Sequence, residues 1–221
     1  MSTAAPPPAG SQTGQELHEP RSRRGTPVWE IAHLYPLQGH WSEQAYFGLE
    51  TKRRIEYADG CLEFLPMPTR SHERIVKFLF RLLDEFALRT GRGEAFFAGI
   101  RVRTIDRFYR LPDLLFITSD RPQEEQFAHG ADLAIEVVSE GEENRRRDLR
   151  EKRAEYAAAG VPEYWIVDPE QKTITVLTLD GDEYRVHGEF NPGATATSVL
   201  LEGFTVDVTA CFAAADDAAA N

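Results

Sequence analysis

The chain has 221 residues, 42% hydrophobic and 28% charged, which suffices for one globular domain with a substantial core. Its 36 acidic and 25 basic residues give a formal net charge of -11 at pH 7. This charge excludes a surface-wide attraction to nucleic acid or anionic membranes, but it allows a local basic groove. No apolar run approaches the ~20 residues of a membrane span, and the first residues lack the apolar stretch of a signal peptide. We therefore expect a soluble, cytoplasmic protein with no membrane partner.

Cysteine and histidine usage argues against a disulfide framework and against a transition-metal site. Cys61 and Cys211 are the only cysteines, and they lie far apart in the sequence. We expect both to be reduced thiols, with no disulfide-linked partner. The six histidines form no His-Glu-x-x-His or His-x-His pair. Any bound metal should therefore prefer oxygen ligands.

Composition divides the chain into a disordered arm, one domain and a tail. Residues 1–27 are rich in Pro, Gly, Ser, Thr and charge, and such a segment cannot bury enough apolar surface to offset its ordering entropy. Residues 213–221, which include the run AAADDAAAN, are predicted to be a disordered tail. Residues 28–212 remain as a single domain.

The first predicted elements are a short helix, a β-hairpin and a long helix. Ser42 precedes EQAYFGLE and is typical of a helix N-cap. The Asp-Gly pair at 59–60 separates two alternating stretches, which predicts a tight hairpin. Apolar residues at helical spacing over 71–89 predict a helix with one apolar stripe about four turns long, ended by Gly91.

A sheet is predicted from the later, strongly apolar stretches. A helix over about 144–159 lies between two of them, and this strand–helix–strand series implies a βαβ crossover. We expect an α/β (α+β) domain with a mixed central sheet flanked by helices. The predicted strands are 95–105, 109–117, 133–139, 164–168 and the TITVLTL segment that follows.

Two acidic residues interrupt strands that should be buried. Period-two alternation in LAIEVVS places Glu136 on the face opposite to Ile135. A buried carboxylate costs several kcal/mol unless it is compensated, although a strand-end Glu could also reach solvent or an arginine. Asp113 follows Pro112 at the edge of another apolar strand. Two carboxylates on adjacent strands can converge on Mg²⁺, which takes oxygen ligands and keeps several waters.

The helix after this strand carries a lysine on its buried side. Leu149, Lys152 and Tyr156 share one helical face, which should point toward the sheet. Lysine is rare in this chain and arginine is common, so position 152 is a candidate for a task that needs an ammonium, such as orienting a water. The alternative is a surface pair between Lys152 and Asp148, which would stabilise the helix only weakly.

Several ordered segments together closely resemble the Uma family, whose members are assigned as endonucleases of the PD-(D/E)XK restriction-endonuclease-like superfamily. The resemblance implies a restriction-endonuclease-like core with an N-terminal β-hairpin. It also implies an Mg²⁺-dependent endonuclease that hydrolyses phosphodiester bonds of DNA, with Mn²⁺ able to substitute. The matching segments are WSEQAYFGL, RIEYADGCLEFLPMPTRSHERIV, LPDLLFI, DLAIEVVS, D-x-x-x-K-x-x-x-Y, GVPEYWIVDPEQKTITV and SVLLEGFTVDVTACF.

The resemblance implies a metal site and a catalytic lysine at defined positions. Asp113 and Glu136 match the two metal-binding acids, and the carbonyl of Val137 is expected to complete the inner shell. The superfamily's usual lysine position is Val138 here, which cannot supply an ammonium. The Uma pattern places its lysine on the next helix instead, where it matches Lys152.

Further residues match positions around the same site. Glu56 matches a catalytic acid of the first strand, although it could instead be an exposed hairpin residue. His72 matches a histidine at a helix start, and its alternative is a helix-cap side chain. Asp148 and Tyr156 also match, either as residues that support the site or as purely structural ones.

The charges near the site leave a second function open. Ser139-Glu140-Gly141 stands where the family commonly has Ser-Pro-Ser, and the added glutamates could repel phosphate. The arginines between 145 and 153 could grip phosphates, or they could form a solvated face paired with glutamates. The alternative function is a non-catalytic nucleic-acid or protein interaction module on a nuclease fold. A third is hydrolysis of RNA or a small nucleotide. Cleavage of both DNA strands would favour a homodimer.

Overall fold

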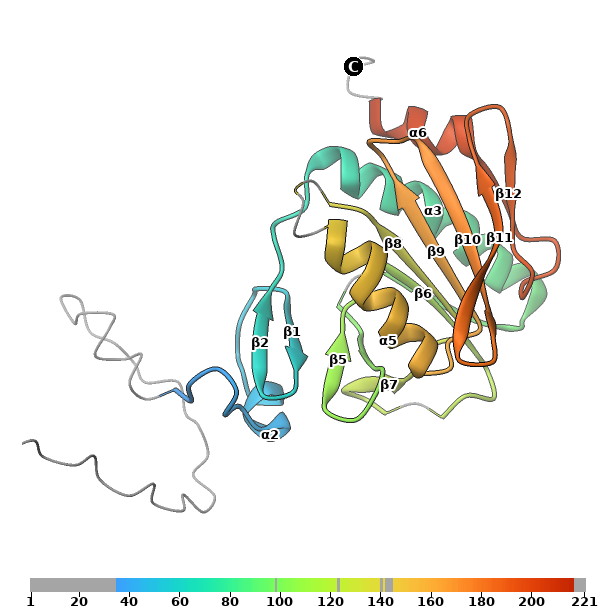
Figure 1. Cartoon of the computed structure of the whole chain (residues 1–221). Helices are drawn as coiled ribbons and strands as arrows, with labels where there is room; N and C mark the ends of the chain where they lie inside the picture. The colour runs from blue at the N-terminus through green and yellow to red at the C-terminus, as the bar shows by residue number, and fades with distance from the viewer. Residues whose placement is uncertain (1–34, 98, 123, 140, 142–144, 217–221) are drawn as a thin grey trace, which may run out of the picture.

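The computed structural model describes residues 35–216 except positions 98, 123, 140 and 142–144 (Figure 1). The predicted arm, 1–27, and the last residues, 217–221, lie outside the described part. Among the described residues, no helix is long and apolar enough to cross a membrane.

The chain forms short strands and a few helices in the following order. The elements are α2 (Glu43–Phe47), β1 (Ile55–Ala58), β2 (Cys61–Phe64), α3 (Arg70–Thr90), β3 (Gly93–Phe97), β4 (Arg101–Arg103), β5 (Phe108–Arg110), β6 (Leu114–Thr118), β7 (Phe127–His129), β8 (Leu133–Val137), the π-helical turn η1 (Arg147–Glu151), α5 (Lys152–Ala158), β9 (Glu163–Asp168), β10 (Thr173–Asp180), β11 (Glu183–Phe190), β12 (Thr195–Thr197), β13 (Thr205–Asp207) and α6 (Val208–Asp216).

Two main sheets organise the fold. The larger has six strands in the order β11-β10-β9-β8-β6-β3, and the smaller has five in the order β2-β1-β5-β4-β7. Within the larger sheet β8 and β9 are parallel, whereas the other neighbours are antiparallel. The connection from β8 through η1 and α5 to β9 is the predicted βαβ unit. The prediction of an α+β domain with a mixed central sheet is confirmed.

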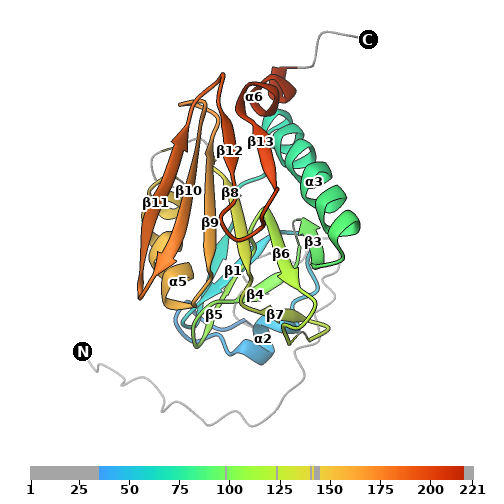
Figure 2. The same ribbon diagram turned by 90° about the vertical axis from the view of Figure 1, so that its right-hand side faces the viewer.

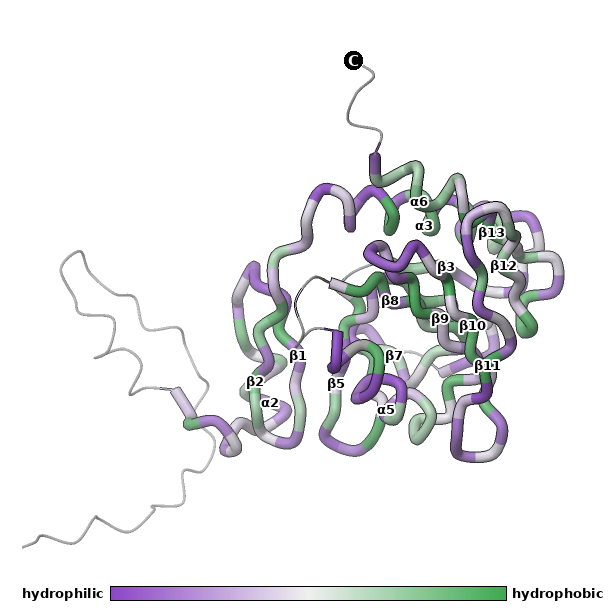
Figure 3. Tube along the Cα trace, turned by 45° about the horizontal axis from the view of Figure 1, so that its top comes forward, coloured by the Kyte–Doolittle hydropathy of each residue, from purple (hydrophilic) through white to green (hydrophobic). Residues whose placement is uncertain are grey.

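Helices cover both faces of the larger sheet. Helices α3 and α6 lie on one side and α5 on the other (Figures 1 and 2). Ile135 on β8 packs into the cluster with α3, whereas Ala134 packs with Tyr156 of α5. The predicted alternation along this strand is therefore confirmed. All five residues of β8 are buried, and its hydrophobic course is visible in Figure 3.

The predicted N-terminal elements are confirmed by their local geometry. The Oγ of Ser42 accepts a hydrogen bond from the N–H of Ala45 at 3.0 Å, as an N-cap should. Asp59 and Gly60 have φ of 42° and 83°, which is the left-handed conformation that a two-residue hairpin needs. Helix α3 spans one residue more at each end than predicted, and Gly91, with φ of 63°, is its C-cap.

The prediction of single strands over 95–105 and 109–117 is wrong, because each segment passes from one sheet to the other. The first divides into β3 of the larger sheet and β4 of the smaller one, with Gly99 at φ 120° between them. The second divides into β5 and β6 around Pro112, which has no N–H to donate to a sheet ladder. Asp113 consequently lies where the chain crosses between the sheets.

The predicted helix over 144–159 is described from residue 145 onward and is not uniform. It contains the π-helical turn η1 before α5, and the N–H of Lys152 donates to the carbonyl of Arg147. Helix α6 continues to Asp216, so residues 213–216 are helical rather than part of a disordered tail. Strand β11 was not predicted.

Candidate active site

The two predicted metal-binding acids lie side by side. Strands β6 and β8 pair antiparallel with Leu114 opposite Ile135, which places Asp113 and Glu136 at the next position of the same register. The N–H of Val137 donates to Asp113 Oδ2 at 3.0 Å. Both acids are buried. The crossing of the chain after Pro112 thus places both acids at the lining of one small cavity.

His72 joins this pair from the first turn of α3. Its Nε2 lies 3.0 Å from the carbonyl oxygen of Val137 and 3.2 Å from Asp113 Oδ2. Both neighbours are acceptors, so this nitrogen carries a hydrogen. Burial lowers the pKa of His72, but the hydrogen bond and charge of Asp113 outweigh burial and raise it. The alternative of a helix-cap side chain is wrong, because Thr69 caps the helix instead.

Asp113 is held as a carboxylate. Arg54 Nη2 donates to its Oδ1 at 3.2 Å. Burial alone would raise the pKa of Asp113, but the hydrogen bond from His72 and the positive charges of His72, Lys152 and Arg54 lower it. A buried group that remains ionised is available as an oxygen ligand.

Lys152 lies between two acids that come from different sheets. Its Nζ donates to Glu136 Oε1 at 2.9 Å and lies 3.5 Å from Glu56 Oε1. The Oη of Tyr156 donates to the same Glu136 oxygen at 2.9 Å. Burial and Glu136 raise the pKa of Tyr156 well above its usual value, which keeps it a donor. The side chain of Asp148, the alternative partner of Lys152, lies outside the described residues.

Glu56 is fully buried on β1, so its alternative as an exposed hairpin residue is wrong. Its Oε1 accepts the N–H of Leu111 at 2.9 Å, and its Oε2 accepts from Arg110 Nη1 at 3.0 Å. Burial would raise the pKa of Glu56, but Lys152 and Arg110 lower it. Glu56 therefore contacts the site through Lys152.

A small cavity of about 20 Å³ lies among these groups, with room for about one water-sized particle. Glu56 is not among the described residues that line it. Among the described residues, no group of three or more His, Cys, Asp and Glu side chains could hold a metal ion. The residues that line the cavity are Arg54, Leu65, Pro66, Pro68, His72, Asp113, Glu136, Val137, Ser139, Arg147 and Lys152.

The available donors suit Mg²⁺ better than a transition metal. Asp113 Oδ2 and the Val137 carbonyl oxygen lie within 3.2 Å of the same His72 nitrogen, and Glu136 lines the same cavity. These donors are hard oxygens. Mg²⁺ needs only one or two carboxylates because it completes its coordination with waters and substrate oxygens, whereas a structural Zn²⁺ site takes four protein ligands. The residues present therefore fit Mg²⁺.

Two arginines of the site, Arg54 and Arg110, were missed by the sequence reasoning, whereas Arg147 was among the arginines expected either to grip phosphates or to form a paired face. Arg54 contacts Asp113, and Arg147 lines the cavity. Arg110 is 2% exposed and pairs with Glu56, Glu63 and Glu155. Arg54 lies just before β1 and two residues before Glu56, where period-two alternation puts both on one face, and Arg110 directly precedes Leu-Pro-Asp. Those spacings were the available signals.

Most of the described arginines between 145 and 153 contact protein groups. Arg145 binds both carboxylate oxygens of Asp168, at 3.1 and 2.7 Å, and Glu170 at 3.1 Å. Arg146 pairs with Glu151, and Arg153 donates to a backbone carbonyl of β11. This arrangement is closer to the predicted paired face than to a set of open phosphate contacts.

The comparisons with known proteins agree with this architecture. The family model Uma2, described as "Putative restriction endonuclease", matches residues 42–209. A crystal structure of a protein described as a "putative nuclease belonging to DUF820", from Anabaena variabilis, is similar with a TM-score of 0.65 and 20% sequence identity. The match covers 81% of this chain and 99% of that one, and it shows a shared fold. No curated protein matches the chain.

Proposed function

The chain belongs to the Uma2 family of restriction-endonuclease-like proteins, and we propose that it is an Mg²⁺-dependent endonuclease that hydrolyses phosphodiester bonds of DNA. One observation carries this proposal. Asp113 Oδ2 and the Val137 carbonyl oxygen both lie within 3.2 Å of His72 Nε2, and Asp113 and Val137 line one small cavity together with the buried Glu136–Lys152 pair. Two oxygen donors, a second carboxylate and an ammonium in one cavity are the groups that metal-assisted phosphodiester hydrolysis requires.

In this proposal Asp113, Glu136 and the carbonyl of Val137 hold the ion. Mn²⁺ favours the same oxygen ligands and should substitute for Mg²⁺. When bound, the ion would polarise the scissile phosphate and lower the pKa of a coordinated water. Burial would raise the pKa of Asp113, but the hydrogen bond from His72 and the nearby positive charges lower it, so the chain contributes one carboxylate that remains ionised despite burial.

Lys152 would act on the water and on the phosphate oxygens. Its contacts with Glu136 and Glu56 hold the ammonium in place, and it lines the small cavity. A fixed ammonium there can orient a water and offset the negative charge that develops in the transition state. Glu56 and Tyr156 would then be positioning residues, because they act through Lys152 and Glu136.

A non-catalytic interaction module is the second candidate, and the charge balance of the site favours it. His72 and Arg54 already contact Asp113, and Lys152 already contacts Glu136. The acids are thus compensated by cations of the chain itself. A module of this kind would keep the fold without binding a divalent ion.

Calorimetric titration of Mg²⁺ and Mn²⁺, followed by a plasmid-nicking assay, separates the two candidates. The wild type should bind the ion and nick plasmid, whereas the double variant Asp113→Asn/Glu136→Gln should do neither. Lys152→Met should still bind the ion but lose nicking by about 10²- to 10⁴-fold. Asp84→Asn, an acid on α3 outside this site, serves as the control. Nicking that persists in the folded double variant would refute the site, and absence of metal binding by the wild type would support the module.

A further inference from the structure

A larger cavity of about 520 Å³ opens beside the catalytic site. It shares His72 and Ser139 with the small cavity, so the two are adjacent. Its volume lies within the range of roughly 300–1,000 Å³ that is typical of sites for small ligands, and one nucleotide unit is a ligand of that size. The cavity therefore has room for one nucleotide next to the reacting phosphate.

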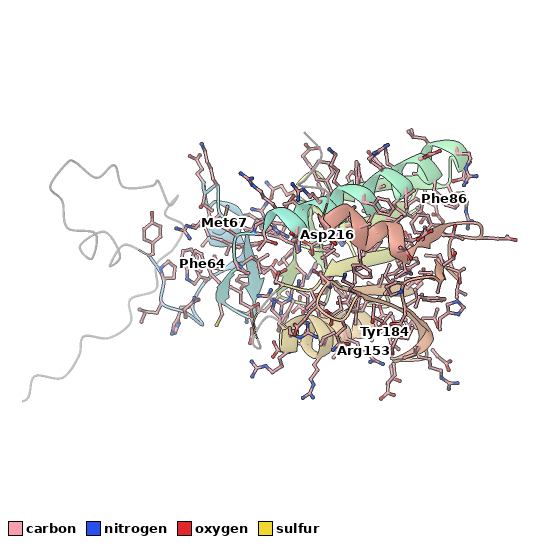
Figure 4. All side chains as sticks on the ribbon, turned by 90° about the horizontal axis from the view of Figure 1, so that it is seen from above. Phe64, Met67, Phe86, Arg153, Tyr184 and Asp216 are labelled. Carbon is pink, nitrogen blue, oxygen red and sulfur yellow. The ribbon has the colours of Figure 1, made fainter. Side chains whose placement is uncertain are left out.

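One wall of this cavity is the connection between β2 and α3, which presents apolar side chains to solvent. Met67, which lines the cavity, is 84% exposed, and Phe64, the last residue of β2, is 55% exposed but is not among the residues that line it. Figure 4 shows both at the same end of the molecule. Pro66 and Pro68 flank Met67 and restrict its backbone, because proline fixes its own φ and limits the residue before it. The N–H of Leu65 donates to the carbonyl of Arg54 at 3.0 Å, which ties the connection to the start of β1.

The opposite wall adds little net positive charge. Arg145 lines the cavity, but it is bonded to both Asp168 and Glu170, and Glu170 lines the cavity as well. Affinity for nucleic acid depends on cations that neutralise phosphates, more steeply for a duplex than for a single strand, and the chain carries a net charge of -11. The polar groups of this cavity include the hydroxyls of Ser71 and Ser139, which suit the hydrogen-bonding edge of a base.

Resting on the proposed function, we propose that this cavity receives an unpaired nucleotide adjacent to the scissile phosphate, with its base against Met67 and the flanking prolines. The substrate class is single-stranded or locally unpaired DNA. A base in a duplex is stacked on both faces and offers only its edges, so an apolar wall can contact a base face only after unstacking. The volume, the exposed apolar wall and the neutralised rim all fit this occupant.

Binding of a labelled oligothymidylate tests the proposal independently of cleavage. Fluorescence anisotropy would be measured with Ca²⁺ in place of Mg²⁺, for the single strand and for the same strand annealed to its complement. We expect the single strand to bind at least about tenfold more tightly than the duplex. Met67→Ala should weaken single-strand binding by about fivefold and leave duplex binding unchanged. Met67→Trp should bind more tightly, with quenching of the added indole fluorescence by the stacked base.

Leu88 provides the matched control. It is 78% exposed and lies near the other end of α3, 18 residues from the helix start, or about 27 Å along the axis. Leu88→Ala and Leu88→Trp should leave the affinity unchanged and show no quenching. Equal affinity for duplex and single strand, no binding of the single strand, or an unchanged affinity in Met67→Ala would overturn the inference. Binding of the single strand through Met67 without any nicking would overturn the proposed nuclease activity and leave this inference standing.

Discussion

Replacement of Lys152 by methionine should destabilise the folded protein measurably, because it removes the ammonium between two buried acids. Its Nζ lies 2.9 Å from Glu136 and 3.5 Å from Glu56, and the residue is 2% exposed. Removal of one partner of a buried ion pair costs about 3–5 kcal/mol. We expect about 3 kcal/mol, the lower end of that range. The reason is that Tyr156 still donates to Glu136 and Arg110 still pairs with Glu56.

The double variant Lys152→Met/Glu136→Gln tests the cause of this loss. Glu136→Gln alone should also destabilise, because it removes the carboxylate that lies 2.9 Å from the Lys152 ammonium, nearer than Glu56 at 3.5 Å. In the double variant the two losses overlap, so the effects should fall short of additivity by about 2 kcal/mol. Such a coupling is expected only if the ammonium compensates the Glu136 carboxylate directly.

Urea unfolding at neutral pH in the presence of a chelator measures these free energies. The fluorescence of Trp165, which is fully buried on β9, reports the transition. If the free energy of unfolding falls with urea concentration at the same slope in each variant, the variants unfold to comparable states. Lys77→Met, on the exposed face of α3, should change the stability by no more than about 0.5 kcal/mol. Strict additivity, or a loss below about 1 kcal/mol in Lys152→Met, would refute the reasoning.

Three further predictions concern the scaffold, and each is checked by urea unfolding. Gly60→Ala should lower the free energy of unfolding by about 2–3 kcal/mol, because the added Cβ would lie 2.6 Å from a backbone oxygen at a positive φ. Gly181→Ala, which has a positive φ but open space around it, should lower it by about 1 kcal/mol. Equal losses in the two variants would contradict this reasoning. Glu163→Gln should lower the free energy of unfolding by about 2 kcal/mol, because the carboxylate accepts four hydrogen bonds and the NH₂ group of glutamine would face some of the same donors. An unchanged midpoint of urea unfolding would argue against this network. Burial would raise the pKa of Asp132, but the hydrogen bond from Arg121 lowers it. The contribution of the Asp132 carboxylate to the free energy of unfolding is therefore complete above about pH 4 and declines as the pH falls through the lowered pKa. Asp132→Asn should therefore lose about 2 kcal/mol at pH 7, with the difference from wild type shrinking below pH 4; a constant difference would be inconsistent with this linkage.

Local patterns in the sequence predicted the elements that depend on neighbouring residues. The Asp-Gly pair at 59–60 gave the hairpin because its conformation is set by two residues. The spacing over 71–89 gave α3, and period-two alternation placed Glu136 on the face that meets α5. The sequence also brought Asp113, Glu136 and Lys152 together as candidates, and the structure places all three around one cavity.

The rest depended on contacts between distant segments. Nothing in the residues 109–117 alone shows that β5 and β6 belong to different sheets, because an apolar strand can pair with either. Arg110 compensates glutamates from β1, β2 and α5 at once, and those elements are placed by tertiary packing rather than by local propensity. Its burial could therefore be found only in three dimensions.

The π-helical turn before α5 determines which side chains share a wall. In a regular α-helix, residues five apart are rotated by about 140° from each other, so Arg147 and Lys152 would point in different directions. The hydrogen bond from the N–H of Lys152 to the carbonyl of Arg147 closes a wider loop, which brings residues five apart closer to eclipsing. Both side chains consequently line the same small cavity. Deletion of a single residue between them would leave the two cations four apart in a regular α-helix, rotated by only about 40°, so the π-helical turn lets the chain hold one extra residue while both cations stay on the same wall.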